Sequence, residues 1–193
     1  MARQEKGAPH CPFAGRTAMM TLQVETAADA LVIEDLLDRA FGPDRWLKTS
    51  YRYRDEIAPL PSLCFTAVED GRVLGTVRHW PIALAEGAAQ GMTAVLLGPI
   101  AVEPSLKATG IGGRLMHLAI QEATRQGVDI IVLVGDPVYY QRFGFRLAAE
   151  FGITMPNESA PRVQALPLSP RAQALTHGGV VARAFPLAYP VAA

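Results

Sequence analysis

The stretch LKATGIGGRL combines three glycines with two basic side chains. Gly110, Gly112 and Gly113 stand beside Lys107 and Arg114, after an apolar run and before a helical pattern. At such a junction, free backbone N–H groups and the helix dipole favour an anion. Glycines let the main chain approach an oxygen-rich group because they have no Cβ. The stretch therefore predicts a phosphate or pyrophosphate site, with a plain helix-initiating loop as the alternative.

Two familiar phosphate-binding patterns do not fit this stretch. The dinucleotide-binding pattern G-x-G-x-x-G would need a third glycine where Leu115 stands. The nucleotide-binding pattern G-x-x-x-x-G-K-[ST] does not occur in the chain at all. The glycines alone therefore leave the phosphate-containing ligand unnamed.

A strand–helix–strand unit positions the glycine stretch. The apolar runs 93–102 and 129–135 are typical of buried strands, and residues 112–127 between them repeat apolar positions at helical spacing. Such a unit places two parallel strands side by side, buried on both faces. Gly98-Pro99 interrupts the first run and predicts a bulge in that strand.

Further elements are expected on both sides of this unit. Two alternating apolar runs flank Asp70-Gly71, which predicts a hairpin. The other expected elements are a strand over 21–26, a helix over 28–41 that ends at Gly42-Pro43, short helices within 43–57 and over 137–143, a strand from 145 onward, and strands in FGITMP and VVARAFPL that a Pro-rich connection joins.

The composition is that of an ordinary globular protein. The 193 residues are 50% hydrophobic and 19% charged, with a formal net charge of zero, which gives no electrostatic reason to expect a nucleic-acid partner. No apolar run reaches the ~18–20 residues of a membrane helix. Cys11 and Cys64 fit no metal or redox spacing, and the N-terminal residues lack the apolar centre of a signal peptide. We expect a reduced, cytoplasmic protein without a metal, with a flexible extension over 1–19 and a single domain over 20–193.

Two longer segments, GPIAVEPSLKATGIGGRLM and GDPVYYQRFGF, carry a family resemblance. KATGIG matches the signature [QR]-x-x-G-x-[GA] except for its lysine, and Tyr140 stands four residues before Gly144-Phe145. With the order of elements over about residues 21–155, these segments resemble the GNAT superfamily of N-acetyltransferases. GDPxYYxRFGF is similar to a segment of an uncharacterised bacterial subgroup. The resemblance implies an α/β fold with a central mixed sheet, whose parallel strands splay apart, flanked by helices.

The resemblance also implies a reaction. Acetyl-CoA would be the co-substrate, and the acceptor would be a primary amine of a small molecule or peptide. Direct attack of the amine on the thioester would pass through a tetrahedral intermediate. The alternative is a CoA-binding sensor or structural module without transferase activity. The protein would be a monomer or a homodimer.

The implied cofactor contacts follow the first parallel strand and the loop after it. The pantetheine arm would lie beside main-chain groups of Ile100, Ala101 and Val102. Asp136, at the carboxyl end of the second parallel strand, either contacts pantetheine or caps the following helix, and Tyr139 either packs or contacts CoA. The pyrophosphate would lie on Lys107, Ala108, Thr109, Gly110, Ile111, Gly112, Gly113 and Arg114.

Tyr140 is the predicted general acid. Collapse of the intermediate expels a thiolate, and a thiol has a reference pKa near ~8.5. A phenol, with a reference pKa near ~10, holds its proton at pH 7 and can pass it to the sulfur as charge develops. An aromatic ring that only anchors its helix to the core is the alternative.

The general base is absent from its usual place. Several family members carry a glutamate early in the central strand, where this chain has Val95-Leu96-Leu97. His79, expected at the end of the hairpin's second strand, is the candidate base, because its reference pKa of ~6.5 lets an imidazole take an ammonium proton. A packing or surface histidine is the alternative.

Five other polar and aromatic residues of this region have expected positions but no assigned chemical role. Trp46, Tyr51 and Tyr53 either line the acceptor pocket or pack in the core. His117 is expected to pack or to face solvent, and Glu103 to be a solvated turn residue.

Overall fold

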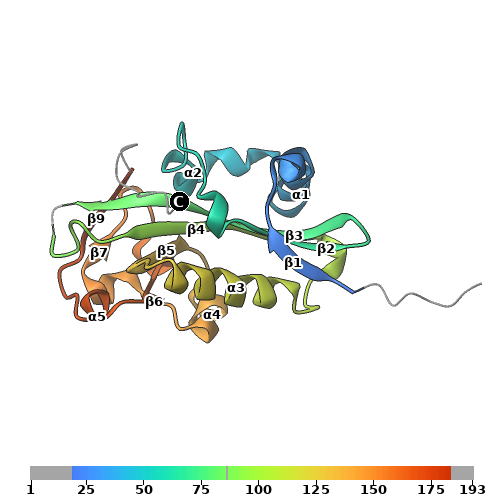
Figure 1. The fold of residues 1–193 in the computed structure, drawn as a ribbon. Helices are drawn as coiled ribbons and strands as arrows, with labels where there is room; N and C mark the ends of the chain where they lie inside the picture. Colours follow the sequence, from blue (N-terminus) through green and yellow to red (C-terminus); the bar gives the residue numbers. More distant parts are fainter. Residues whose placement is uncertain (1–18, 86, 184–193) are drawn as a thin grey trace, which may run out of the picture.

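The computed structural model describes residues 19–85 and 87–183, which form a nine-stranded mixed sheet flanked by helices (Figure 1). The main path of the sheet is β1-β2-β3-β4-β5-β8-β6, and β9 pairs with both β3 and β7. This arrangement confirms the predicted fold class. The strands are β1 (Thr21–Val24), β2 (Phe65–Glu69), β3 (Arg72–Ala85), β4 (Ala94–Val102), β5 (Ile130–Val134), β6 (Arg146–Leu147), β7 (Ile153–Thr154), β8 (Val163–Pro167) and β9 (Gly179–Arg183).

The parallel strands β4 and β5 pair over only part of their length. Their register runs from Ala94 opposite Ile130 to Leu96 opposite Val132, and both strands continue beyond it. In the next residues of β4, the pairing with β3 shifts register at the predicted bulge, Gly98-Pro99. The two strands therefore lose their mutual hydrogen bonds at the point where β4 is irregular, which leaves room between their carboxyl ends.

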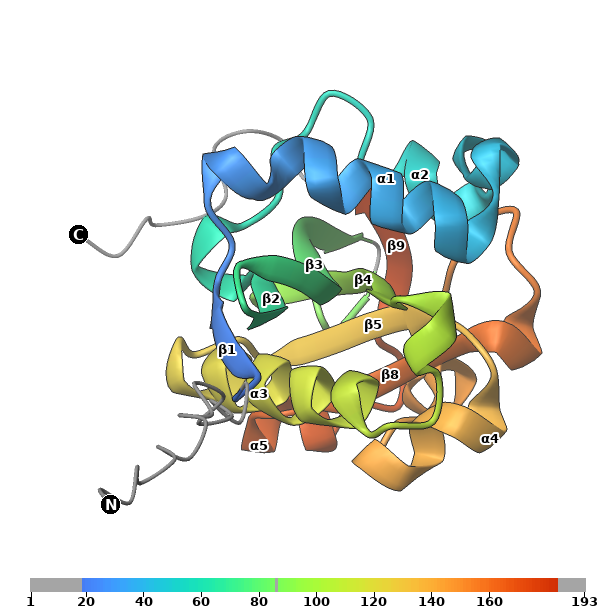
Figure 2. The ribbon, with the colours of Figure 1, turned by 90° about the vertical axis from the view of Figure 1, so that its right-hand side faces the viewer.

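Helices cover both faces of the sheet (Figure 2). α1 (Ala30–Phe41) and the short α2 (Thr49–Arg52) lie on one face, and α3 (Ile111–Arg125) and α4 (Pro137–Tyr140) lie on the other. The fifth helix, α5 (Pro170–Gln173), lies in the C-terminal segment. Both longer helices bury one apolar face: Ile33, Leu36 and Leu37 of α1 pack on Val73 and Ala101, and Leu115, Met116, Ala119 and Ala123 of α3 pack on the opposite face.

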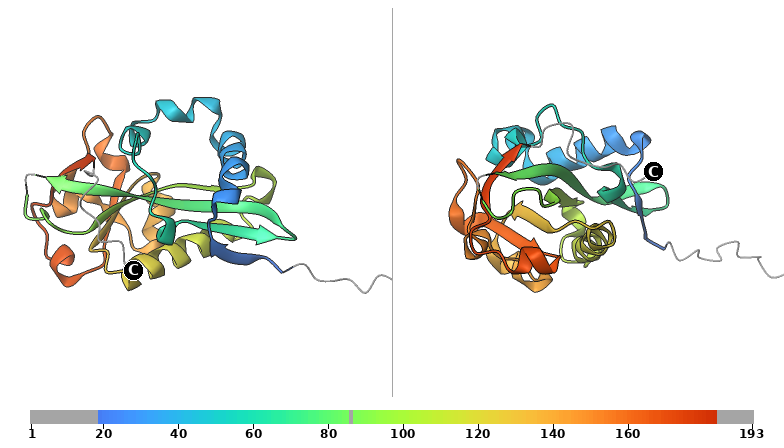
Figure 3. Two further views of the ribbon diagram at one scale, coloured as in Figure 1. Left: turned by 45° about the horizontal axis from the view of Figure 1, so that its top comes forward. Right: turned by 60° about the vertical axis from the view of Figure 1, so that its left-hand side comes forward.

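The C-terminal segment differs from the prediction in one strand. Residues 163–167, expected within a Pro-rich connection, form β8, which pairs antiparallel with all five residues of β5. Pro161 precedes the strand and Pro167 is its last residue, and a short run between prolines resembles a loop when only its composition is considered. Figure 3 shows the C-terminal segment, orange to red, at one end of the sheet. Phe151, Ile153 and Val181 of this segment bury their side chains in one core cluster with Trp80 and Leu96, so it completes the sheet's core.

Further sequence predictions concern the N-terminal residues, the two cysteines, membrane-spanning helices and metal sites. Residues 1–18 of the predicted extension, with Cys11, lie outside the described residues, and the division at residue 20 stays a prediction. Cys64 is a buried free thiol whose Sγ lies 3.1 Å from the carbonyl oxygen of Leu60. Within the described ranges, no helix has the length and apolarity needed to cross a membrane. The same ranges contain no group of three or more His, Cys, Asp or Glu side chains that could hold a metal ion.

Candidate active site

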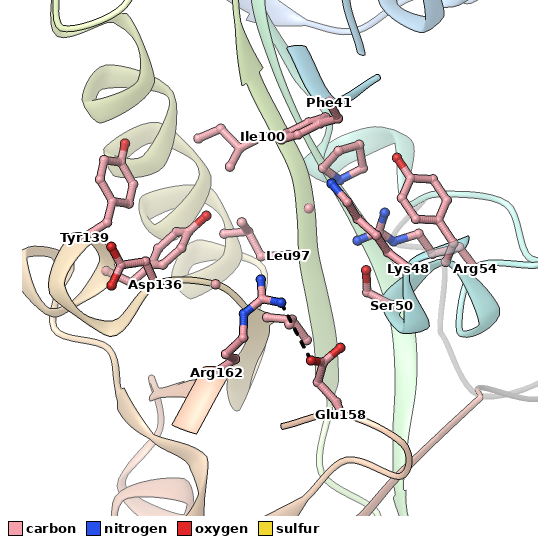
Figure 4. Close-up of a pocket in the computed structure, with 16 residues that line it drawn as sticks. Phe41, Lys48, Ser50, Arg54, Leu97, Ile100, Asp136, Tyr139, Glu158 and Arg162 are labelled. Atoms are coloured by element: carbon pink, nitrogen blue, oxygen red, sulfur yellow. Dashed lines mark ion pairs between the residues drawn. The ribbon is translucent and has the colours of Figure 1, made fainter. Parts of the chain in front are cut away.

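A cavity of about 360 Å³ lies where β4 and β5 separate (Figure 4). Four segments contribute to its wall: the bulge of β4, the end of β5 with α4, the region from α1 to α2, and a C-terminal turn. Its position at the carboxyl ends of parallel strands is where open α/β sheets bind their ligands. The cavity is lined by Phe41, Lys48, Ser50, Tyr51, Arg54, Leu97, Gly98, Pro99, Ile100, Val134, Gly135, Asp136, Tyr139, Tyr140, Glu158 and Arg162.

A second hollow of about 240 Å³ adjoins this cavity and reaches the glycine loop. It is lined by Ile100, Ala101 and Val102 of β4 and by Lys107 and Gly112 of the loop. Both hollows share Phe41, Ile100, Tyr139 and Tyr140 in their walls. The predicted pantetheine-binding strand and the predicted pyrophosphate loop therefore border two adjoining hollows, which together are called the channel.

The glycine loop presents main-chain groups with little steric cover. Ala108 and Gly110 adopt left-handed conformations, with φ of 66° and 88°, and α3 begins directly after Gly110. The first hydrogen bond of the helix runs from Arg114 N to Gly110 O at 3.0 Å, and the preceding N–H groups of a helix have no intrahelical acceptor. A Cβ added at Gly110 or Gly113 would meet nothing within 4 Å. These amides are therefore open to an anion, and the pyrophosphate site stays a prediction.

The two neighbouring tyrosines enter the channel from α4. A Cβ at Gly112 would lie 3.3 Å from the hydroxyl of Tyr139, so this phenol is next to the glycine loop. The ring of Tyr140 packs directly over Gly135, where any Cβ would overlap its Cε2 atom. Tyr140 also makes an edge contact with Phe145, with ring centroids 5.9 Å apart. Glycine at position 135 is thus required for the position of Tyr140.

Burial keeps the hydroxyl of Tyr140 protonated. Burial raises the pKa of Tyr140 to about 12, and Tyr139 and Asp136 add to this shift. At neutral pH the phenol is therefore a hydrogen-bond donor that faces the channel.

Asp136 caps the helix that carries both tyrosines. Its Oδ1 accepts a hydrogen bond from the backbone N–H of Val138 at 3.0 Å, and Pro137 occupies the first helical position. Such a cap satisfies one of the free N–H groups of the first turn. Of the two roles predicted for Asp136, capping is the one that the structure displays, although its side chain also lines the cavity.

His79 lies in the core rather than at the end of a strand, which corrects the predicted position. β3 continues to Ala85, so His79 is in mid-strand, and its side chain is fully buried. Its Nδ1 lies 2.7 Å from the carbonyl oxygen of Leu63, and the buried Nε2 has no hydrogen-bond partner among the described residues. Burial lowers the pKa of His79 to about 4. A buried, neutral imidazole outside the cavity wall is a packing residue, and we do not propose it as the base.

The depressed pKa of His79 predicts acid sensitivity of the fold. Between pH 6.5, the usual pKa, and about 4, the unfolded chain binds a proton that the folded chain does not, so stability falls as pH falls. From pH 7 to pH 5 this loss is about 2 kcal/mol, because each pKa unit corresponds to about 1.4 kcal/mol. Urea unfolding should show that His79→Asn loses about 2 kcal/mol less than the parent over this interval. Equal losses in both proteins would contradict the prediction.

The remaining candidates from the sequence are placed as follows. Tyr51 lines the cavity, whereas Tyr53 is buried and its hydroxyl donates to Pro156 O at 3.3 Å. Trp46 is 58% exposed, outside the cavity wall. His117 is exposed, in edge contact with Phe143, as expected for a solvent-facing residue. Glu103 is a correction: it is buried and pairs with Arg39 at 3.0 Å, instead of being solvated.

Four charged residues of the cavity were not predicted from the sequence. Lys48 and Arg54 flank α2, and Glu158 and Arg162 come from the turn before β8. Glu158 and Arg162 form a loose ion pair at 3.9 Å. No spacing rule joins these positions, because they are brought together only when both segments fold over the open end of the β4–β5 pair.

Comparison with known sequences points to acetyl transfer. The family model described as the acetyltransferase (GNAT) family matches residues 31–145. The uncharacterised N-acetyltransferase YhbS of Escherichia coli strain K12 is 31% identical over 131 residues, which cover 67% of this chain and 75% of YhbS. The uncharacterised N-acetyltransferase YjhQ of the same strain is 26% identical over 129 residues, which cover 67% of this chain and 71% of YjhQ.

Solved structures of GNAT family proteins are also similar to this chain. The crystal structure of the GNAT family protein YhbS from Escherichia coli in complex with CoA superposes with a TM-score of 0.71 and 26% identity, covering 88% of this chain and 92% of YhbS. A GNAT family acetyltransferase from Brucella melitensis in complex with acetyl-CoA has a TM-score of 0.64 and 27% identity, covering 86% of this chain and 97% of its own.

Proposed function

The chain belongs to the GNAT family of acetyltransferases and is an acyltransferase, and from this premise we propose that it moves the acetyl group of acetyl-CoA to a primary amine. The family resemblance seen in the sequence is thereby confirmed, whereas the finer bacterial subgroup stays a prediction. The proposal depends mainly on one observation: the channel from the glycine loop to the cavity, with Tyr139 and Tyr140 in its wall throughout.

The channel supports acetyl-CoA as the donor. The exposed amides after Gly110, with Lys107 beside them, offer the charge and hydrogen bonds that a pyrophosphate needs. Main-chain groups of β4 from Ile100 to Val102 border the next part of the channel, where the pantetheine arm would lie. The thioester would then lie at the bulge, beside Gly98 and Tyr140. Two relatives whose structures hold CoA or acetyl-CoA support this donor.

The proposed reaction needs one proton to leave the amine and one to reach the sulfur. The amine nitrogen forms a bond with the acetyl carbon, and the bond between that carbon and sulfur breaks. Tyr140 holds a proton at neutral pH and lies in the cavity wall, so we assign it the role of general acid toward the leaving thiolate. The amine's proton leaves through Glu158 or water, since Glu158 is the carboxylate of the cavity that caps no helix.

An acceptor screen tests the proposed function. With acetyl-CoA and a panel of primary amines, we expect at least one amine to release free thiol about 10-fold or more above the rate of acetyl-CoA hydrolysis. Mass spectrometry should detect the acetylated amine in equal amount. If acetyl-CoA binds in calorimetry and no amine accelerates thiol release, the chain is a CoA-binding module instead.

A further inference from the structure

Two cations on the acceptor side of the cavity have no acidic partner. Lys48 precedes α2 and Arg54 follows it, and both line the cavity (Figure 4). Within residues 19–85 and 87–183, no ion pair joins either side chain to a carboxylate. The Nε and Nη1 atoms of Arg54 are buried and have no hydrogen-bond partner among these residues. A buried charge normally has a partner, so this arrangement points to an anion that arrives with a ligand.

Aromatic rings and further cations surround these two side chains. The guanidinium of Arg54 stacks 4.6 Å from the ring centroid of Tyr51 and 5.1 Å from that of Trp80. Burial lowers the pKa of Arg54 to about 10, so it stays charged at neutral pH. Burial also lowers the pKa of Lys48, and the positive charges of Arg162 and Arg54 lower it further. This part of the cavity therefore carries an excess of positive charge.

The bulge of β4 lies next to the cations. A Cβ at Gly98 would lie 3.2 Å from Nη2 of Arg54, which places the guanidinium beside the position proposed for the thioester. A group bound by Arg54 would therefore be a few bonds from the reacting amine. The cavity has a volume near the lower end for small-molecule sites, and the acetyl group occupies part of it, which limits the acceptor to a small molecule.

The acidic residues of the cavity lie elsewhere in its wall. Asp136 is engaged in capping α4. Glu158 accepts a hydrogen bond from Ser159 N at 3.2 Å and is 3.9 Å from Arg162, so its carboxylate keeps capacity for an amine. The cavity thus offers a carboxylate for an ammonium and two cations for an anion.

Building on the proposed acetyl transfer, we propose that the acceptor is a small primary amine that carries a carboxylate, as amino acids do. The carboxylate binds Lys48 and Arg54, and the amine faces Glu158 and the thioester. Charge-assisted hydrogen bonds to a buried guanidinium give the site its selectivity, because an uncharged analogue leaves the cations without a partner.

Paired acceptors test this assignment. Each common α-amino acid and several short ω-amino acids are compared with their primary amides, and phosphoethanolamine is compared with ethanolamine. Thiol release should give kcat/KM values roughly 10- to 100-fold higher for the best carboxylate than for its amide. Arg54→Gln, and independently Lys48→Gln in case the first variant folds poorly, should reduce this ratio to within about threefold. Arg52→Gln removes an exposed charge at the end of α2, between Lys48 and Arg54, and should leave the ratio of carboxylate to amide rates unchanged.

The outcomes separate the acceptor class from the proposed function. Equal kcat/KM values for the carboxylate acceptor and its amide in the parent protein would overturn the assignment. An equal loss of kcat/KM for the two acceptors in Arg54→Gln would also overturn it, because this result would place Arg54 at the thioester instead. A preference confined to phosphoethanolamine would replace the carboxylate by a phosphate. If no amine reacts, calorimetry measures whether amino acids bind to the CoA-loaded protein. If amino acids bind and Arg54→Gln weakens this binding, the anion site is supported although the proposed acetyl transfer fails. If no amino acid binds, both the anion site and the proposed acetyl transfer are overturned.

Discussion

Replacing Tyr140 by phenylalanine is expected to lower kcat about 10²- to 10⁴-fold, the usual contribution of a positioned general acid. The substitution keeps the ring that packs over Gly135 and against Phe145, so the fold and the channel wall should remain. Only the hydroxyl proposed to protonate the departing sulfur is lost. Acetyl-CoA affinity, measured by calorimetry, should change by less than about threefold, because the phenol acts mainly as the thiolate forms.

Tyr139→Phe is the matched comparison for Tyr140→Phe. The hydroxyl of Tyr139 lies beside the glycine loop rather than in the packed position over Gly135. Its loss should therefore raise KM for acetyl-CoA more than it lowers kcat. Single-turnover measurements should be used, so that chemistry and not product release is observed. If Tyr140→Phe turns over within a factor of about two of the parent, the sulfur obtains its proton from another donor.

The pKa of Tyr140 adds a pH signature to the same prediction. A general acid acts in its protonated form, which is lost as pH rises through the pKa of the folded protein. Because burial raises this pKa to about 12, kcat should show no decline from Tyr140 deprotonation between pH 7 and pH 10. A decline centred near pH 8 or 9 that disappears in Tyr140→Phe would show that the phenol is far more acidic than its burial implies.

The parts of the fold that follow from local pattern could be predicted from the sequence. The βαβ unit around α3, the hairpin at Asp70-Gly71 and the bulge at Gly98-Pro99 each have a signal within a few residues, because chain reversal and burial on both faces restrict residue choice locally. β8 has no such signal, since its strand character depends on pairing with β5 rather than on its own composition. Leu31, an apolar residue of the expected helix over 28–41, is 81% exposed because it lies off the face of α1 that packs on the sheet.

The candidate site divides in the same way. The glycine loop, β4 and Tyr140 come from one continuous stretch of motif-bearing sequence, and the structure brings them to one channel. His79 illustrates the limit, because whether a histidine in a strand faces a cavity or the core depends on which elements pack on that strand. Lys48, Arg54 and Glu158 show the opposite case, because they line the cavity and no sequence pattern indicated them. Glu158 is more than one hundred residues from Lys48 and Arg54 in the sequence and meets them only through tertiary packing, so no local spacing could reveal this group.

Replacing Gly110 by aspartate is expected to abolish acetyl-CoA binding, with a loss of affinity of at least about 100-fold, because placing like charges together costs several kcal/mol. The new carboxylate would stand at the start of α3, among the amides proposed to hold the pyrophosphate. Stability should fall by only about 1–2 kcal/mol, the cost of placing a non-glycine residue at a left-handed φ of 88°. Aspartate tolerates left-handed backbone better than most residues, the added Cβ meets nothing within 4 Å, and a negative charge at a helix N-terminus is favourable.

Gly127→Asp at the opposite end of α3 is the control that isolates the loop. Gly127 also has a left-handed φ, 75° against 88° at Gly110, and an added Cβ there also meets open space, so both variants introduce the same charge under similar backbone strain. The charge at the C-terminal end opposes the helix dipole, which makes this variant the less stable of the two. Calorimetry should nevertheless give parental acetyl-CoA affinity for Gly127→Asp and none for Gly110→Asp. Parental affinity in Gly110→Asp would mean that the pyrophosphate is bound elsewhere.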